Sequence, residues 1–263
     1  MPKRKKFKAK ELKHDPFRDW YERQAERARL HKEPIRRTMI GFLATIVLLS
    51  ASGLGYSLWK GAAQTHLARA FDLFNADVTE TPPASPAVRT YKTEEEKYRA
   101  ALEAYQRVSD RWYYKYSGYG ETASYYKALC QLHLKPSEGQ ALLERLAQGH
   151  SMTARLARLA LAQHVIAQGD GARAETLYRQ LIQEPGQLPK PHLQLGLARA
   201  LELQGKKADA VNLYVEIAKE RAQELEGSEA VNRLAVLDPK ALDQLPTNPR
   251  SPARDALSRY TKK

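Results

Sequence analysis

The sequence predicts an all-α protein in which a single transmembrane helix is followed by a short α-solenoid. Three observations lead to this fold class. Thr38 to Trp59 contains no charged side chain, and the chain after residue 93 is rich in alanine, with apolar residues at helical spacing. Within that later region, small, aromatic and aliphatic residues recur at a fixed offset, which is typical of stacked helix pairs.

The chain of 263 residues has a net charge of +13, and this charge is unevenly distributed. Residues 1–37 contain 14 Lys and Arg against 6 Asp and Glu, a net charge of +8. Because basic residues beside a membrane span stay on the cytoplasmic side, we expect the N-terminus in the cytosol and the main body across the membrane. Cys130 is the one cysteine, so no intramolecular disulfide can form.

Residues 1–37 are predicted to be a cytosolic basic tail that includes an amphipathic helix. Six basic residues lie between Lys3 and Lys10. They suit a topology determinant, a contact with anionic lipid headgroups, or a contact with nucleic acid or a ribosome. The last interpretation has the least support, because the run contains a single aromatic residue. Further along, Phe17, Trp20 and Tyr21 lie at helical spacing among arginines, which suits a membrane interface or a partner helix.

Thr38 to Trp59 is predicted to cross the membrane and to contact its lipid. Its 22 residues form a helix about 33 Å long, which exceeds a hydrocarbon core of about 30 Å. A buried helix of a soluble protein would carry charge on some face, and a cleaved signal peptide would not follow a 37-residue leader. Small residues four apart, Ala51 with Gly55 and Gly53 with Ser57, have the spacing of helix–helix contacts.

Two segments connect the span to the main body. Residues 60–78 are predicted to continue the helix as a membrane-proximal helix, because no helix breaker follows the span. Leu67, Phe71 and Phe74 form an apolar stripe on this helix, and the stripe needs a cover. Residues 79–92 contain three prolines and are predicted to be a linker or an ordered extended loop.

Residues 93–226 are predicted to form the helical repeats, beginning with a capping box at Thr93 and Glu96. A pattern of four residues recurs at an offset of 36. Its glycine permits the turn between two helices, its alanine lets them approach, and its tyrosine and aliphatic residue fill the gap to the next pair. The two copies are Gly169, Ala174, Tyr178 and Leu181, and Gly205, Ala210, Tyr214 and Ile217.

A more divergent copy occurs 73 residues before the first of these, where Glu96 replaces the glycine and Ala101, Tyr105 and Val108 keep the spacing. An offset of 73 is close to two periods. A degenerate helix-turn-helix is therefore predicted between the copies, at Thr122 to Gln148.

These spacings resemble the tetratricopeptide repeat, a helical hairpin of about 34 residues. The resemblance is good for the last two pairs, partial for the first and poor for the second. The whole layout is also similar to a bacterial family of single-pass inner-membrane proteins with such repeats, to which the ancillary subunit of the Sec translocon belongs. That likeness implies a bacterial inner-membrane location, repeats in the periplasm or outside, and a chaperone-like role in protein translocation or envelope protein folding.

In tetratricopeptide repeats the first helix of each pair lines a groove that binds protein partners. The resemblance implies such a groove here, and the alternative is a solvated face without a partner. The implied groove residues are Gln163, Ile166, His192, Leu195, Arg199 and Glu202.

Six of the 14 tyrosines lie between Tyr113 and Tyr126. They suit either packing between the first repeats or an aromatic patch that binds protein segments, since Tyr and Trp dominate binding hot spots. Residues 227–263 are predicted to form a capping helix, at Ser228 to Leu237, and a Pro-rich tail. The candidate patch residues are Trp112, Tyr113, Tyr116, Tyr119 and Tyr126.

The sequence predicts no catalytic residue, no cofactor and no metal site, because it lacks phosphate-binding glycine loops and nucleophile elbows and its seven histidines are scattered. We therefore expect a membrane-anchored scaffold or adaptor, not an enzyme, that binds protein partners on the non-cytosolic face. The alternative is a permanent accessory subunit of a larger membrane protein complex. A third hypothesis places the function in the cytosolic tail.

Overall fold

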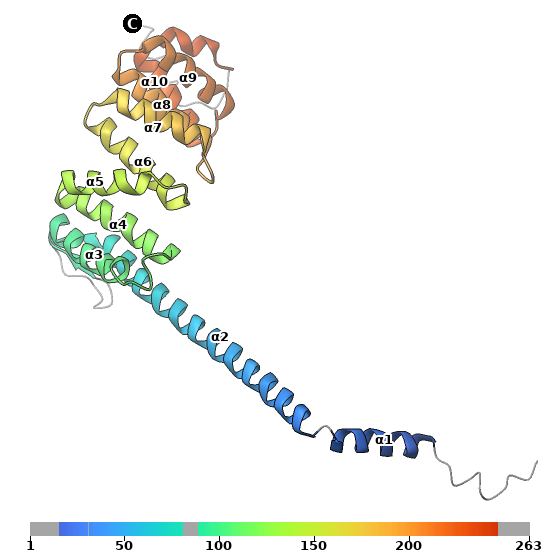
Figure 1. The fold of residues 1–263 in the computed structure, drawn as a ribbon. Helices are drawn as coiled ribbons and strands as arrows, with labels where there is room; N and C mark the ends of the chain where they lie inside the picture. Colours follow the sequence, from blue (N-terminus) through green and yellow to red (C-terminus); the bar gives the residue numbers. More distant parts are fainter. Residues whose placement is uncertain (1–15, 31, 81–88, 247–263) are drawn as a thin grey trace, which may run out of the picture. The chain divides into compact units, whose positions relative to one another are not determined.

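The computed structural model describes residues 16–30, 32–80 and 89–246, which are helical apart from turns and one pair of two-residue strands (Figure 1). The predicted all-α repeat fold is confirmed in these residues. The chain divides into two compact units, Met1–Ala62 and Ala63–Lys263. The basic run near the N-terminus, the centre of the predicted linker (81–88) and the end of the predicted tail (247–263) lie outside the described residues.

The first unit begins with the helix α1 (Pro16–Leu30), which has the predicted amphipathic composition. Its aromatic side chains Phe17 and Trp20 are exposed, with ring centres 5.9 Å apart. The helix ends at Leu30, because Pro34 has no N–H to donate to the carbonyl of that residue.

The helix α2 (Lys32–Phe74) runs without interruption for 43 residues and contains the charge-free segment. The large apolar side chains from Met39 to Leu58 are exposed to solvent. Among the described residues, Arg36–Phe74 is the helical segment whose length and composition would allow it to cross a membrane. Tyr56 and Trp59 stack at the end of the charge-free segment, with ring centres 5.8 Å apart.

The second unit begins with the last turns of α2, which pack against α3 (Glu94–Ser109). Phe71 and Phe74 lie edge-on against Tyr105, with ring centres 5.9 and 6.4 Å away. The predicted apolar stripe is therefore covered by aromatic rings of the repeats. The helix runs on past the charge-free segment but ends at Phe74 and not at residue 78, and its last turns pack against α3.

Regular structure borders the predicted linker on both sides. The strand β1 (Asp77–Val78) pairs in parallel with β2 (Thr90–Tyr91). Thr79 N–H extends this pairing by donating to the carbonyl of Tyr91 at 2.9 Å. The expectation that residues 79–92 lack regular structure was therefore wrong at their C-terminal end, which lies beyond the prolines and is free to pair.

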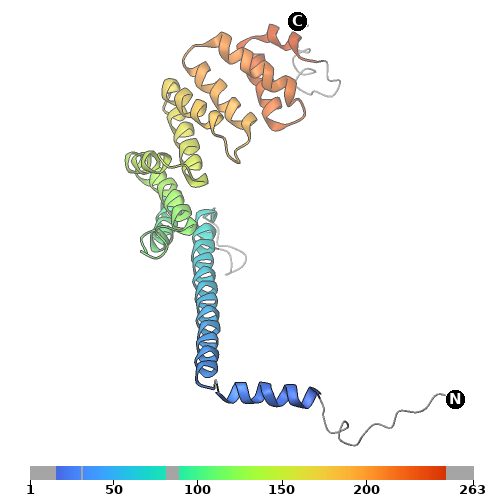
Figure 2. The ribbon, with the colours of Figure 1, turned by 45° about the vertical axis from the view of Figure 1, so that its right-hand side comes forward.

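The remaining helices stack in two layers (Figure 2). Consecutive helices pack against each other, and α4 also contacts α6, α6 contacts α8, and α8 contacts α10. These four helices form one layer, which we term the inner layer, and α3, α5, α7 and α9 form the other. The helices are α4 (Gly118–Leu134), α5 (Pro136–Ala147), α6 (Met152–Ala167), α7 (Gly171–Gln183), α8 (Lys190–Leu203), α9 (Lys207–Glu220) and α10 (Leu225–Leu237).

The recurring residues occupy the positions that helix pairing requires, and the predicted repeat is confirmed. Gly169 and Gly205 adopt φ angles of 83° and 73° in the turns before α7 and α9, a conformation that glycine reaches without strain. Ala174 and Ala210 are completely buried between helices. Thr93 caps α3 as predicted, since its Oγ1 accepts a hydrogen bond from the N–H of residue 96 at 3.2 Å.

The degenerate copy predicted at Thr122 to Gln148 corresponds to α4 and α5. Its pattern is Gly139, Leu143 and Leu146, with the spacing of the Ala, Tyr and Leu of the clear copies. A Cβ atom on Gly139 would lie 2.3 Å from the backbone nitrogen of Leu132, so α5 approaches α4 more closely than alanine would allow. This close approach explains why the copy departs from the consensus.

The repeats extend further toward the C-terminus than predicted. The predicted capping helix is longer, since α10 begins at Leu225, and it contacts α8 as the last member of the inner layer. The 3₁₀ helix η2 (Pro239–Gln244) then buries Ala241 against the core. The first part of the predicted Pro-rich tail is therefore regular, because proline is tolerated in the first turn of a helix.

Candidate partner-binding surfaces of the repeats

The inner layer carries two adjoining pockets between α6, α8 and α10, with volumes of about 90 and 280 Å³. All six candidate groove residues line one or both of them. The pockets share Arg199 and Glu229, so they form one surface, which we term the groove. The first is lined by Gln163, Tyr178, His192, Leu195, Gly196, Arg199, Leu225, Glu226 and Glu229, and the second by Ile166, Arg199, Glu202, Leu203, Glu229 and Arg233.

Two ion pairs connect α8 to α10 across the groove. Arg199 pairs with Glu229, and Glu202 pairs with Arg233. The hydroxyl of Tyr214, from α9, also donates to Oε2 of Glu202 at 3.1 Å. Arg199 and Glu202 were expected to face a partner freely, whereas the structure places them in ion pairs. The reason is α10, whose charged side chains lie opposite theirs.

The surroundings shift the pKa values of two members of this network, Tyr214 and Arg233. Burial raises the pKa of Tyr214 to about 12, so its hydroxyl remains a donor. The hydrogen bonds that the Arg233 guanidinium donates to Glu202 raise the pKa of Arg233 above its usual range. The Tyr214 hydroxyl and the Arg233 guanidinium therefore both remain hydrogen-bond donors to Glu202.

The other candidate groove residues differ in exposure. Gln163 and His192 are exposed and Ile166 is half-buried, so these three can contact a partner. Leu195 is only 4% exposed and belongs to the hydrophobic core, which corrects its assignment as a free contact. The floor of the groove is a close contact between helices, which allows no side chain at Gly196.

The predicted aromatic patch divides into two parts, and half-buried Tyr126 packs among the rings of the first helix pair. Its ring centre lies 4.7 Å from Phe71, 5.4 Å from Phe74 and 5.3 Å from Tyr105. Tyr126 therefore packs the first helix pair against α4 and is not a surface residue of the patch.

The remaining patch residues lie in and after the loop between α3 and α4. Trp112 and Tyr116 are 80% and 89% exposed, Tyr113 is exposed to a smaller extent, and Tyr119 is half-buried at the start of α4. Packing between the first repeats thus applies to some residues of the tyrosine-rich segment, and an exposed aromatic patch applies to others. The sequence alone could not divide them, because all are aromatic and closely spaced.

The described residues contain no group of three or more His, Cys, Asp or Glu side chains that could hold a metal ion. The thiol of Cys130 is buried, and burial raises its pKa to about 12, so it stays protonated at neutral pH. The described surfaces contain apolar side chains, aromatic side chains and paired charged side chains.

The charged groove residues Glu229 and Arg233 are among those that sequence reasoning missed, together with Tyr178, Gly196, Leu203, Leu225 and Glu226. Glu229 and Arg233 lie four apart on α10 and therefore on one helix face, and they follow their partners on α8 by 30 and 31 residues. That separation is close to the repeat period and is the signal that could have revealed them.

Comparisons with known proteins leave this chain without a family. No family model matches it, and no curated protein matches it. A solved structure that matches is a protein from Podosopora anserina, described as a kinesin light chain with nearly identical TPR-like repeats. It is 18% identical with a TM-score of 0.48, and the match covers 63% of this chain and 86% of that chain. The repeat assignment accordingly rests on the helix pairs described above.

Proposed function

We propose that this protein is a membrane-anchored helical-repeat scaffold that binds other proteins through the groove. The observation that carries the proposal is the continuity of α2. A single helix contains the exposed, charge-free segment and ends as the first helix of the repeats. No loop separates the charge-free segment from the repeats along the chain.

The distribution of charge supports an orientation with the N-terminus in the cytosol. The repeats would then act on the non-cytosolic side, with the periplasm of a bacterium as the proposed setting and protein translocation or envelope protein folding as the proposed process. The basic N-terminus would contact anionic lipid on the opposite side of the membrane. Confinement to the membrane surface raises the effective concentration of the groove near membrane-bound partners, without requiring a tight site.

The groove suits a polar peptide segment with one apolar anchor. Gln163 and His192 provide hydrogen-bonding groups, and Leu225, which is 80% exposed, provides an apolar contact beside them. The paired charges of Arg199 and Glu229 can bind a backbone or a charged side chain by exchanging partners. These contacts favour a binding role over a catalytic one.

A pair of matched glutamines tests the groove. Gln163 lies in the groove, whereas Gln180 is an exposed residue of α7 in the other layer. We expect a photoreactive amino acid at position 163 of the full chain, in intact cells, to crosslink a defined set of non-cytosolic proteins. The same amino acid at position 180 should not capture that set. Equal labelling from both positions, or labelling of cytosolic proteins alone, would contradict the proposal.

The second candidate function is a permanent accessory subunit of a membrane complex. It is favoured by the small residues four apart in the charge-free segment, Ala51 with Gly55 and Gly53 with Ser57, whose spacing allows close helix–helix contacts. Purification in mild detergent separates the two functions. A subunit should remain with its partners in fixed stoichiometry through long washes, whereas a scaffold with several clients should release a mixed set of proteins.

A further inference from the structure

The loop between α3 and α4 exposes large aromatic side chains that the proposed binding function leaves unused. Trp112 is 80% exposed and Tyr116 is 89% exposed, and the ring of Tyr113 lies beside Trp112 with centres 5.6 Å apart. Exposed aromatic residues grouped in one loop mark an interaction surface more often than an accident of packing. We refer to residues 111–116 as the aromatic loop.

The backbone of the aromatic loop is held in a defined conformation. Tyr114 points inward and is 2% exposed. Its carbonyl accepts hydrogen bonds from the N–H and the Oγ of Ser117, at 2.8 and 2.7 Å. A Cβ atom on Gly120 would lie 2.1 Å from the same carbonyl oxygen, so the loop packs directly on the first turn of α4. The exposed rings are therefore presented by a fixed support.

The charge of the aromatic loop is basic. Arg111 lies 5.8 Å from the ring centre of Tyr113, and Lys115 lies 5.6 Å from that of Tyr116. The neighbouring acid, Asp110, accepts a hydrogen bond from Lys127 of α4 at 3.0 Å, and its charge is thereby compensated. A basic surface with aromatic rings is the composition that binds the headgroup region of an anionic bilayer.

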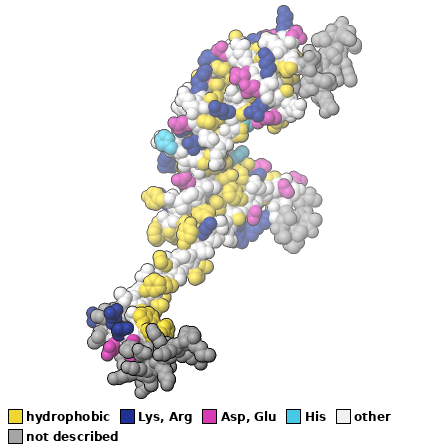
Figure 3. All heavy atoms as spheres, turned by 90° about the vertical axis from the view of Figure 1, so that its right-hand side faces the viewer, with side chains coloured by type: hydrophobic (Ala, Val, Ile, Leu, Met, Phe, Trp, Pro, Cys, Tyr) yellow, Lys and Arg dark blue, Asp and Glu magenta, His cyan; other side chains and the backbone are white. Residues whose placement is uncertain are grey.

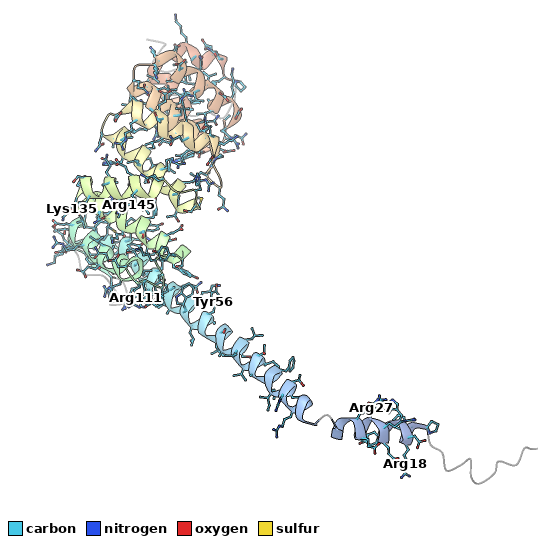
Figure 4. All side chains as sticks on the ribbon, in the orientation of Figure 1. Arg18, Arg27, Tyr56, Arg111, Lys135 and Arg145 are labelled. Carbon is cyan, nitrogen blue, oxygen red and sulfur yellow. The ribbon has the colours of Figure 1, made fainter. Side chains whose placement is uncertain are left out.

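The direction of α3 places the aromatic loop at the end of the unit where α2 enters. Phe74, the last residue of α2, lies beside Tyr98 near the start of α3. Phe71, one turn earlier in α2, lies beside Tyr105, two turns later in α3. The two helices are therefore antiparallel, and α3 ends near the Ala63 end of α2. Figure 4 shows Arg111 at this edge of the unit, and Figure 3 shows hydrophobic side chains gathered over the same end.

This end of the unit cannot lie far from the proposed membrane surface. Trp59 and its stacked partner Tyr56 end the charge-free segment, where aromatic residues mark the interface of a span. Three residues lie between Trp59 and Ala63, so the two Cα atoms are at most about 14 Å apart even in an extended chain. Connectivity alone thus keeps the Ala63 end of the unit near the headgroups, and the direction of α3 places the aromatic loop toward this end.

We propose that the aromatic loop is a second membrane contact, in which Trp112 and Tyr116 enter the headgroup layer of an anionic phospholipid bilayer and Arg111 and Lys115 bind lipid phosphates. The proposal rests on the membrane anchor of the proposed function. With α2 as the first contact and the loop as the second, the repeats would be fixed against rotation about α2. The groove would then face a constant direction relative to the membrane.

Tryptophan fluorescence of the full chain in vesicles tests the proposal. The chain has three tryptophans, so Trp20→Phe with Trp59→Phe leaves Trp112 as the one reporter. In vesicles of phosphatidylglycerol and phosphatidylcholine, we expect its emission to be blue-shifted and to be quenched by headgroup spin-labelled lipid. Vesicles of phosphatidylcholine alone, or the added changes Arg111→Glu and Lys115→Glu, should shift the emission back to the red and remove most of the quenching.

Two further reporters make the outcomes distinguishable. Trp59 as the single tryptophan reports the anchor, and Val236→Trp in a chain whose natural tryptophans are all Phe reports an exposed site on α10. Quenching of Trp59 and Trp112, without quenching at position 236, supports the proposal. Quenching of Trp59 with a red-shifted, unquenched Trp112 overturns it, leaves the anchor intact and points to a protein partner for the loop. An unquenched Trp59 overturns the anchor itself and, with it, this proposal.

Discussion

The repeat unit carries a cluster of aromatic rings where α2 enters it and two ion pairs between α8 and α10 near its other end. At the α2 end, Phe71 and Phe74 pack among tyrosines of α3 and α4 at ring-centre distances of 4.7 to 6.4 Å. At the α10 end, Arg199 and Arg233 reach across to carboxylates of the neighbouring helix and stay about 40% exposed.

The two kinds of contact differ in how salt and the removal of a side chain affect their contribution to stability. Aromatic contacts depend on shape and burial, so they are insensitive to salt and lost as a whole when a ring is removed. Partly exposed ion pairs contribute little to stability, are screened by salt and can exchange partners. Loss of one ring at the α2 end should therefore cost more stability than loss of one ion pair between α8 and α10, and the ion pairs are suited to contact with changing partners.

The largest expected effect comes from removing one ring at the α2 end. We expect Phe74→Ala to lower the free energy of unfolding of the repeats by about 3 kcal/mol, because a large side chain is lost from between three tyrosines. Since each repeat contacts only its neighbours, hydrogen exchange should accelerate in α3 and α4 and stay unchanged in α9 and α10.

Tyr105→Phe is the matched control for this variant. Its hydroxyl is buried and has no hydrogen-bond partner among the described residues, so removing it should leave stability unchanged or raise it. Uniform acceleration of exchange along all repeats in Phe74→Ala would show that the two ends are one cooperative unit, and the comparison would fail.

An intermediate effect is expected from Gly196→Ala in α8. The new Cβ atom would lie 2.2 Å from Cζ of Tyr178, and moving that ring should cost about 2 kcal/mol of unfolding free energy. Thermal unfolding followed by circular dichroism measures this loss. Gly118→Ala, at a position with open space, is the control and should change little. Equal losses in both variants would mean that a general helix effect, not the contact, is responsible.

The smallest effect is expected from the charged end. Glu202→Gln removes the charge that Arg233 and Tyr214 share, and we expect a loss of about 1 kcal/mol at low salt. In 1 M salt the loss should shrink, because the partly exposed pair is already screened, whereas the loss in Phe74→Ala should be the same at both salt concentrations. A salt-independent loss in Glu202→Gln would contradict the contrast between the ends.

Much of the fold could be predicted from local patterns. The offset of 36 residues between Gly169 and Gly205 identified two helix pairs and their turns, because a glycine in a tight turn and an alanine at a helix contact are needed wherever helices pair. The degenerate pair was placed by length alone. Its own motif, Gly139 with Leu143, was not recognised, because closer helix packing had replaced the alanine by glycine.

Less of the candidate surfaces could be predicted. The six groove residues gather at the two pockets, but the buried position of Leu195 and the pairing of Arg199 depend on α10, whose role the sequence pattern did not reveal. The tyrosine-rich segment likewise could not be divided into core and surface. The aromatic side chains of this segment are chemically alike, and whether each one is covered depends on the helices that pack beside it.

The sequence by itself determined the helical class, the charge-free segment of α2 and the period of the repeats, because these follow from the type and spacing of neighbouring residues. Only the tertiary structure decided that the end of α2 is the first repeat helix, that Tyr126 packs among rings while Trp112 is exposed, and that Glu202 is paired with Arg233. These outcomes arise from contacts between residues about 30 or more positions apart, and such contacts leave no signal in local periodicity.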